Sequence, residues 1–160
     1  MTEDRKVLAI LQPSLGRRII GIGSLCAIGF FVGYLSFMAP GAFFWQLVLF
    51  IIAIVAIWAA NQIRLATQFQ IEMTDVDIRD SSGAVLAEFD EIEKVDRGVF
   101  AFKPSNGFLL LLKKNARPSW QPGMWWRFGR RVGVGGMTAG AEAKFMADLI
   151  AMRLEEIKSQ

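Results

Sequence analysis

The chain of 160 residues contains no histidine, a single cysteine and a single tyrosine. Without histidine, neither a Ser-His catalytic arrangement nor a zinc site built on Cys and His side chains can form. The lone cysteine, Cys26, excludes a disulfide within the chain. The glycines before the last predicted helix lack both the Gly-Lys-Ser/Thr ending and the GxGxxG spacing of nucleotide-binding loops. We therefore expect no catalytic residues, no cofactor and no metal.

Charged side chains are missing from the stretch between Arg18 and Arg64. This gap is roughly 45 residues long, and a membrane-spanning helix needs about 20 apolar residues. Pro40 and Gly41 divide the gap, because proline lacks a backbone donor and glycine tolerates turn geometry. The sequence therefore predicts a transmembrane hairpin over 19–63, with helices near 19–39 and 42–62.

The charges that flank the hairpin predict its orientation. Basic residues lie before the first span and after the second, whereas the connecting loop has none. They are Arg5, Lys6, Arg17, Arg18 and Arg64. The positive-inside rule then places both termini in the cytoplasm of a multi-pass protein of the bacterial inner membrane. A cleavable signal peptide is disfavoured, because no small-residue cleavage region follows the first span. Residues 1–18 become a cytoplasmic segment and 64–160 a cytoplasmic domain.

Small residues in the predicted helices indicate close packing. Gly29 and Gly33 have small-xxx-small spacing in the first helix, and the second helix is rich in alanine. Such residues let helix backbones approach each other in lipid. The two helices can pack on each other, or Gly29 and Gly33 can support self-association or contact with a membrane-protein partner. No ionisable group lies within either span, which disfavours an ion path.

After Gln68 the apolar period changes from helical to two residues, which is typical of half-buried strands. Turn-forming residues at 80–83 and 104–107 separate these short segments. Strands are predicted near 69–73, 76–79, 85–89, 92–95, 99–103, 108–112 and 132–134. The residues after Pro118 are expected to be irregular until Trp125.

The last predicted element is an amphipathic helix from Thr138 to about Lys158. One apolar stripe runs along it, suited to covering the open side of a small sheet or barrel. The stripe consists of Phe145, Met146, Leu149, Ile150, Leu154 and Ile157.

The stretch IEMTDVDIRDSSGAVLAEFDEIEKVDRG, residues 71–98, resembles the bacterial pleckstrin-homology-like membrane proteins in its order of strands and turns. The resemblance extends from about Leu65 to the end. It implies a β-rich, pleckstrin-homology-like barrel or sheet capped by a C-terminal helix, and a binding or scaffolding module without chemistry of its own. The turn Thr74–Asp77 is acidic, whereas classical members hold inositol phosphates there with basic residues.

Charge is separated along the predicted domain. Nine carboxylates lie between Glu72 and Asp96, whereas eight lysines and arginines and no acid lie between Arg97 and Arg131. Anionic headgroups attract basic residues by about 1 kcal/mol each near a membrane surface. The bilayer is therefore the expected counterpart of the basic half. Nucleic acid is not expected as a partner, because the domain is held at the membrane.

The densest basic and aromatic stretch is WQPGMWWRFGRR, residues 120–131. Tryptophan and arginine are enriched at protein interfaces, and amphipathic aromatics also at membrane surfaces. The residues expected to contact a membrane or partner are Trp120, Trp125, Arg127, Arg130, Arg131, Lys113 and Lys114. Trp126 and Phe128 are expected in the core. Two non-catalytic functions fit: an interaction or scaffold module that supports a larger membrane complex, or a binder of anionic headgroups or other anions.

Overall fold

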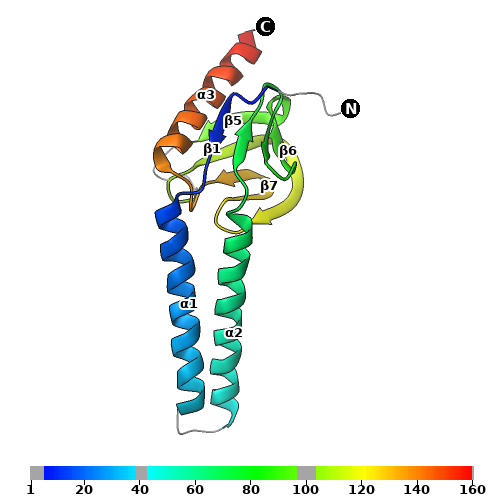
Figure 1. The fold of residues 1–160 in the computed structure, drawn as a ribbon. Helices are drawn as coiled ribbons and strands as arrows, with labels where there is room; N and C mark the ends of the chain where they lie inside the picture. The colour runs from blue at the N-terminus through cyan, green and yellow to red at the C-terminus, as the bar shows by residue number, and fades with distance from the viewer. Residues whose placement is uncertain (1–5, 39–42, 97–103, 160) are drawn as a thin grey trace. The chain divides into compact units, whose positions relative to one another are not determined.

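The computed structural model describes residues 6–38, 43–96 and 104–159. The chain forms two compact units (Figure 1). One is a helical hairpin of residues 15–65. The other is a globular unit, formed by the residues up to Ser14 together with those from Ala66 onward. The proline and glycine between the two helices and the strand expected at 99–103 lie outside the described residues.

The hairpin consists of α1 (Leu15–Met38) and α2 (Phe43–Ala66), each of 24 residues. Mean hydropathies of 2.0 and 2.5 make both helices apolar enough to cross a membrane, and both are long enough. At 1.5 Å per residue each helix is about 36 Å long, against about 30 Å for a bilayer core. The helices extend about four residues beyond the predicted bounds at the ends that bear Arg17, Arg18 and Arg64. The predicted bounds were the ends of the apolar run. Basic residues end an apolar run, but they do not end a helix.

Small residues bring α1 and α2 together. A side chain at Gly29 would meet Ile57, and one at Gly33 would touch Ala53. Near the connecting loop, the hydroxyl of Ser36 donates to the carbonyl of Gln46 over 2.8 Å. Both glycines thus face α2 within one chain, which is the packing alternative left open by the sequence.

The globular unit contains two antiparallel sheets and one long helix. The first sheet has the order β1-β2-β3-β4, the second β5-β6-β7, and the 3-10 turn η1 (Phe89–Glu91) connects them. The strands are β1 (Ala9–Leu11), β2 (Ile71–Met73), β3 (Asp77–Asp80), β4 (Val85–Glu88), β5 (Ile92–Asp96), β6 (Phe108–Gln121) and β7 (Trp125–Val134), and the helix is α3 (Gly140–Ser159).

Strand β1 comes from the residues that precede the hairpin. Ala9 pairs with Met73 and Leu11 with Ile71, and the side chain of Leu11 is fully buried in the core. The hairpin is therefore inserted between the first and second strands of one sheet. Residues 1–18 were expected to be a cytoplasmic N-terminal segment, and no strand was predicted within it. A three-residue strand has too little pattern to be recognised without its partner.

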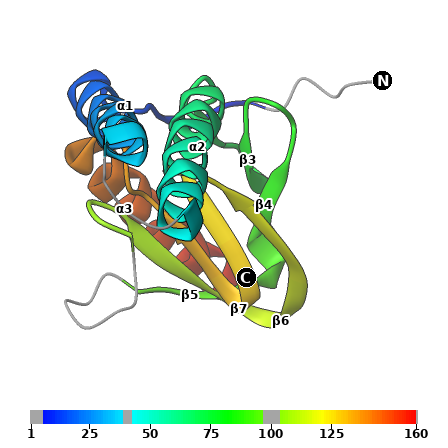
Figure 2. The same ribbon diagram turned by 90° about the horizontal axis from the view of Figure 1, so that it is seen from below.

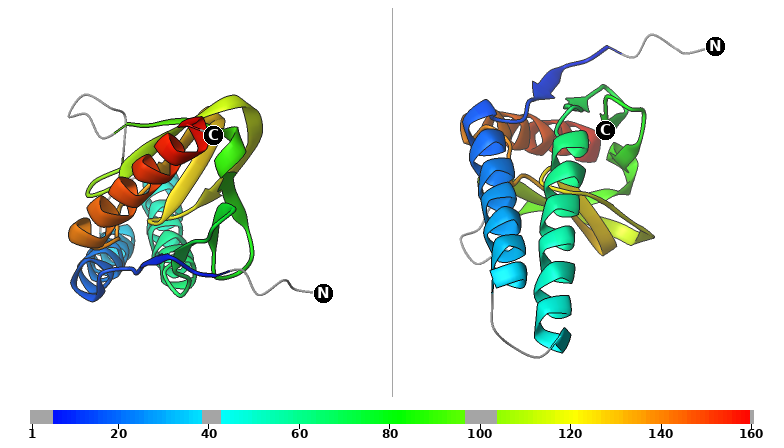
Figure 3. Two further views of the ribbon diagram at one scale, coloured as in Figure 1. Left: turned by 90° about the horizontal axis from the view of Figure 1, so that it is seen from above. Right: turned by 60° about the horizontal axis from the view of Figure 1, so that its bottom comes forward.

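Helix α3 lies across the strands and packs against β1, β5 and β6 (Figure 3). Met146, Ile150 and Leu154 are buried, as the apolar stripe predicted. Phe145 and Ile157 belong to the predicted stripe but are exposed. Small buried residues, Ala143 and Ala147, complete the packed face instead. The inward face of α3 is therefore narrower than the stripe suggested.

Strands β6 and β7 form a long, strongly bent hairpin (Figure 2). The sequence predicted irregular chain after Pro118, but β6 continues to Gln121. The register shifts between Ala116 and Ser119, around the proline. Such irregularities accommodate a residue that cannot donate to a strand ladder. The basic and aromatic stretch therefore lies on paired strands.

Candidate interaction surface

Four consecutive residues of β7, Trp125 to Phe128, alternate between the two faces of the strand. Trp125 and Arg127 share one face, and Trp126 and Phe128 share the other. Trp120 of β6 pairs with Trp126, and paired residues of antiparallel strands lie on the same face. Three aromatic side chains therefore gather on a face that excludes Trp125.

The face with Trp125 points into the globular unit. Trp125 is only 4% exposed, and its indole N–H donates to Oε1 of Gln121 over 2.6 Å. Phe128, by contrast, is 72% exposed. Trp125 was expected at the surface and Phe128 in the core, and both expectations were wrong: Trp125 belongs to the core and Phe128 to the surface. Both faces carry a large aromatic residue, so apolar character alone does not decide which one is buried.

Arg127 also points inward and connects the two sheets. Its guanidinium donates to the carbonyls of Val85 and Leu86 in β4, over 2.9 and 3.2 Å, and to that of Arg117 in β6 over 2.9 Å. These bonds satisfy carbonyl groups of the first sheet with a side chain of the second. Arg127 was expected to contact a membrane or partner, but it holds β4 against β7.

The outward face forms a shallow depression of about 470 Å³, lined by Trp120, Trp126, Phe128 and Arg131, which we call the aromatic surface. Trp120 is 67% exposed despite its size. Trp126 is partly buried because its indole lies over Gly133, where an added Cβ would overlap the ring. Gly133 therefore acts as a packing position for Trp126.

Two of the other basic candidates, Arg130 and Lys113, make hydrogen bonds within the globular unit. Arg130 donates to the carbonyl of Leu112 over 2.8 Å and forms an ion pair with Glu93. Lys113 donates to the carbonyl of Asp90 over 2.7 Å. Lys114, one residue later on β6, is exposed. The structure thus brings Trp120 and Arg131 together on one surface and uses Arg127, Arg130 and Lys113 in contacts within the unit.

Residues of the globular unit that flank the hairpin in the chain are connected to the turn between β6 and β7. The Gln121 amide donates to the carbonyl of Ala66, the last residue of α2, over 3.4 Å. On the other side, Met137 donates to the carbonyl of Gly123, and Ser14, which precedes α1, donates to that of Met137. Trp120 of the aromatic surface therefore lies one residue from Gln121, which contacts the last residue of α2. Nothing in the sequence pattern predicted this contact.

Carboxylates of the first sheet stabilise its turns. The Thr74 hydroxyl donates to Asp77 Oδ1 over 2.7 Å, and Asp80 Oδ1 accepts the backbone N–H groups of Ser82 and Ala84. Asp77 and Asp80 are both buried. The acidic turn that departs from the pleckstrin-homology pattern thus has a structural use.

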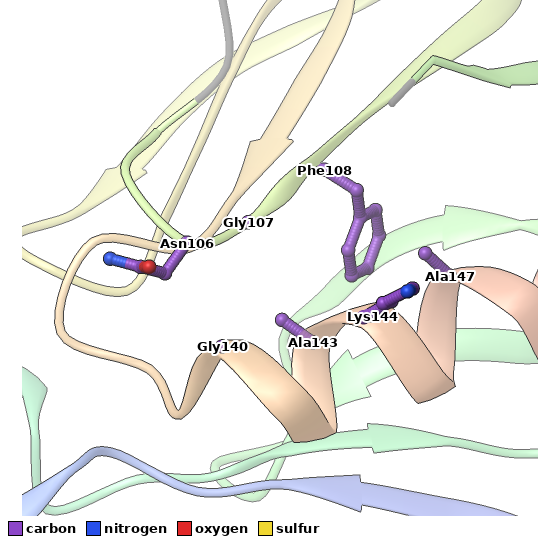
Figure 4. A pocket seen from close by; sticks show the side chains of 7 residues that line it. All are labelled: Asn106, Gly107, Phe108, Gly140, Ala143, Lys144 and Ala147. Atoms are coloured by element: carbon purple, nitrogen blue, oxygen red, sulfur yellow. The ribbon is translucent and has the colours of Figure 1, made fainter. Parts of the chain in front are cut away.

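A second hollow, of about 350 Å³, lies between the β5–β6 connection and the start of α3 (Figure 4). Its lining is mostly backbone and apolar atoms, and Lys144 is the one ionisable side chain among the described residues that border it. A single ammonium group provides no acid–base pair. The residues lining this hollow are Asn106, Gly107, Phe108, Gly140, Ala143, Lys144 and Ala147.

Within residues 6–38, 43–96 and 104–159, no three His, Cys, Asp or Glu side chains are grouped closely enough to hold a metal ion. The aromatic surface places indole and phenyl rings beside a guanidinium. Comparisons of the chain with protein-family models, curated proteins and solved structures find no match in any of the three.

Proposed function

We propose that this protein is a non-catalytic interaction module, anchored by two membrane spans at the cytoplasmic face of the inner membrane. In this role it supports the assembly or stability of a larger membrane complex. The proposal includes the resemblance to the bacterial pleckstrin-homology-like proteins. Two antiparallel sheets followed by a C-terminal helix support that assignment.

The observation that carries the proposal is the insertion of the hairpin between β1 and β2. Because Ala9 pairs with Met73, the residues before α1 and after α2 must lie on the same side of any membrane that the helices cross. Two spans meet this requirement and one does not. The basic residues at those ends, Arg17, Arg18 and Arg64, favour the cytoplasmic side. A unit attached to the membrane at two points is well suited to hold a partner at a fixed distance from the membrane surface.

Surface chemistry supports binding rather than catalysis. The aromatic surface supplies apolar contact and positive charge, which are the features of interface anchors. It supplies no nucleophile paired with a base. Contact with anionic headgroups is a second candidate function, and the place of the aromatic surface beside the hairpin junction favours it.

Crosslinking in native membranes, followed by mild detergent extraction and mass spectrometry, tests the scaffold function. We expect crosslinks between the globular unit and a membrane protein other than this chain. Recovery of this protein alone, at the expression level of the native strain, would contradict the proposal.

The topology is tested separately with reporters fused after Gln160. A reporter active only in the periplasm should stay silent, and one active only in the cytoplasm should give a signal. The reverse pattern would overturn the orientation and with it the cytoplasmic partner.

A further inference from the structure

We propose that the aromatic surface rests in the headgroup layer of the membrane that the hairpin crosses, with Trp120 and Phe128 in the interface and Arg131 paired with anionic lipid. This inference rests on the proposed membrane anchoring and names the ligand of one surface. The ligand class is the anionic phospholipid headgroup, bound in cis.

The first step is the place of the surface within the globular unit. Gln121 is hydrogen-bonded to Ala66, where α2 ends, and the neighbouring Gly123 is connected through Met137 to Ser14. The ends of spanning helices emerge at the boundary between hydrocarbon and water. Trp120, the residue before Gln121, is therefore close to the residue at which α2 ends.

The second step is the rigidity of this turn. Buried Trp125 holds Gln121 through the 2.6 Å bond from its indole, so the residue that reaches Ala66 is itself fixed by the core. On the other side, Gly135 donates to the carbonyl of Met124 over 2.8 Å. Trp120 and Phe128 project from strands β6 and β7, whose residues Gln121 and Trp125 are hydrogen-bonded to each other. The positions of both side chains are therefore fixed within the globular unit.

The third step is the chemistry of the exposed side chains. Trp120 and Phe128 expose most of their area, and the depression between them also contains Arg131. Amphipathic aromatic rings settle at the headgroup level, where one part of the residue meets hydrocarbon and another meets water. Arginine pairs with phosphate oxygens through its planar fork of donors. Both preferences are met by a phospholipid headgroup layer.

The fourth step is charge complementarity. Strands β6 and β7 carry six basic residues and no acidic one. Although Lys113, Arg127 and Arg130 make contacts within the unit, Lys114, Arg117 and Arg131 are exposed on the same hairpin. Carboxylates are concentrated on the other strands, β2 to β5. The β6–β7 hairpin, which carries the aromatic surface, therefore has the charge that anionic lipid attracts.

A fluorescent probe tests this placement in the full-length protein. In a Cys26→Ala background, Phe128→Cys carries an environment-sensitive label, and the protein is reconstituted into nanodiscs whose anionic lipids bear a headgroup nitroxide quencher. The matched control is Met152→Cys on α3, which is 59% exposed and belongs to the same unit. We expect several-fold stronger quenching at position 128 than at 152, decreasing as salt rises.

A paired substitution tests which side chains hold the surface in place. Trp120→Ser combined with Arg131→Glu should remove most of the excess quenching at position 128. Phe145→Ser combined with Lys144→Glu, which removes one exposed aromatic and one exposed basic residue from α3, should leave it unchanged. Protease resistance of the globular unit verifies that both double variants remain folded.

Equal quenching at positions 128 and 152 in a folded, inserted protein would overturn the lipid assignment. Crosslinks from position 128 to another protein in native membranes, without lipid quenching in nanodiscs, would also overturn it while leaving the scaffold function intact. If alkaline carbonate extracts the protein from membranes, the membrane anchoring fails and both proposals fall.

Discussion

Strand β7 carries aromatic and basic residues on both of its faces, and the two faces have different roles. Trp125 and Arg127 bond to Gln121 and to the carbonyls of β4, so they hold the globular unit together. Trp126 and Phe128 lie on the opposite face with Trp120 and Arg131. The comparison shows that hydrogen-bond partners, rather than residue type, decide which aromatic and which arginine belong to the core.

The largest expected contrast is between two tryptophans. Trp125→Ala should destabilise the globular unit by about 3–5 kcal/mol, because it removes a buried aromatic side chain and leaves a cavity. Trp120→Ala should change stability by less than about 0.5 kcal/mol, as surface substitutions usually do. Pulse proteolysis of the full-length protein across a urea series measures both. Similar losses for the two variants would mean that the faces are not distinct.

Strand β1 extends the comparison to the residues before the hairpin. Leu11→Ala should cost about 2–5 kcal/mol, since Leu11 is fully buried, whereas the exposed Ile10→Ala should cost less than about 1 kcal/mol. The same urea series applies. If Leu11→Ala left the globular unit as stable as the unchanged protein, β1 would not be part of its core.

The two arginines form a third contrast. Arg127→Met keeps the length of the side chain but removes its bonds to the carbonyls of β4, and we expect a loss of about 1.5–3 kcal/mol. Arg131→Met should be nearly neutral for stability. Hydrogen exchange of the β4 amides provides a second readout, because weaker closure between β4 and β7 should speed their exchange. Unchanged exchange in Arg127→Met would contradict the closure role.

Gly133 offers the smallest contrast. An added methyl group would overlap the indole of Trp126, so Gly133→Ala should cost about 1–3 kcal/mol or displace that ring. Gly23→Ala in α1 has open space around it and should be tolerated. The emission of Trp126, measured with the other four tryptophans replaced by phenylalanine, reports the displacement. An unchanged spectrum and unchanged stability would place the indole elsewhere.

The hairpin and strands β2 to β5 were predictable because their signals are local. A charge-free run reveals helices long enough to cross a membrane, and two-residue alternation reveals short strands. β1 was missed because three residues have meaning only beside β2, more than 60 positions later. β6 was truncated because Pro118 is a strand breaker unless the register shifts around it.

The candidate site was predicted in composition but not in orientation. The dense stretch of tryptophan and arginine pointed to residues 120–131 as a contact surface, which stays a prediction, and the structure brings Trp120 and Arg131 together in one depression. The sequence does not indicate which side chains of β7 face the core, because each alternate set within WWRF contains a large aromatic residue. Long-range partners decide it: Gln121 for Trp125, and Val85 with Leu86 for Arg127. The hydrogen bond from Gln121 to Ala66 likewise joins residues 55 positions apart in the sequence.

One β unit is assembled from the residues on both flanks of the helical hairpin, and a cysteine crosslink tests this assembly most directly. In a Cys26→Ala background, Ile10→Cys and Glu72→Cys place thiols on directly paired residues, within reach of a disulfide. Ile10→Cys with Arg79→Cys, one strand further away, is the control. Mass spectrometry of the digested, oxidised protein should find an intrachain link for the first pair only. A first pair that links no better than the control would contradict the claim.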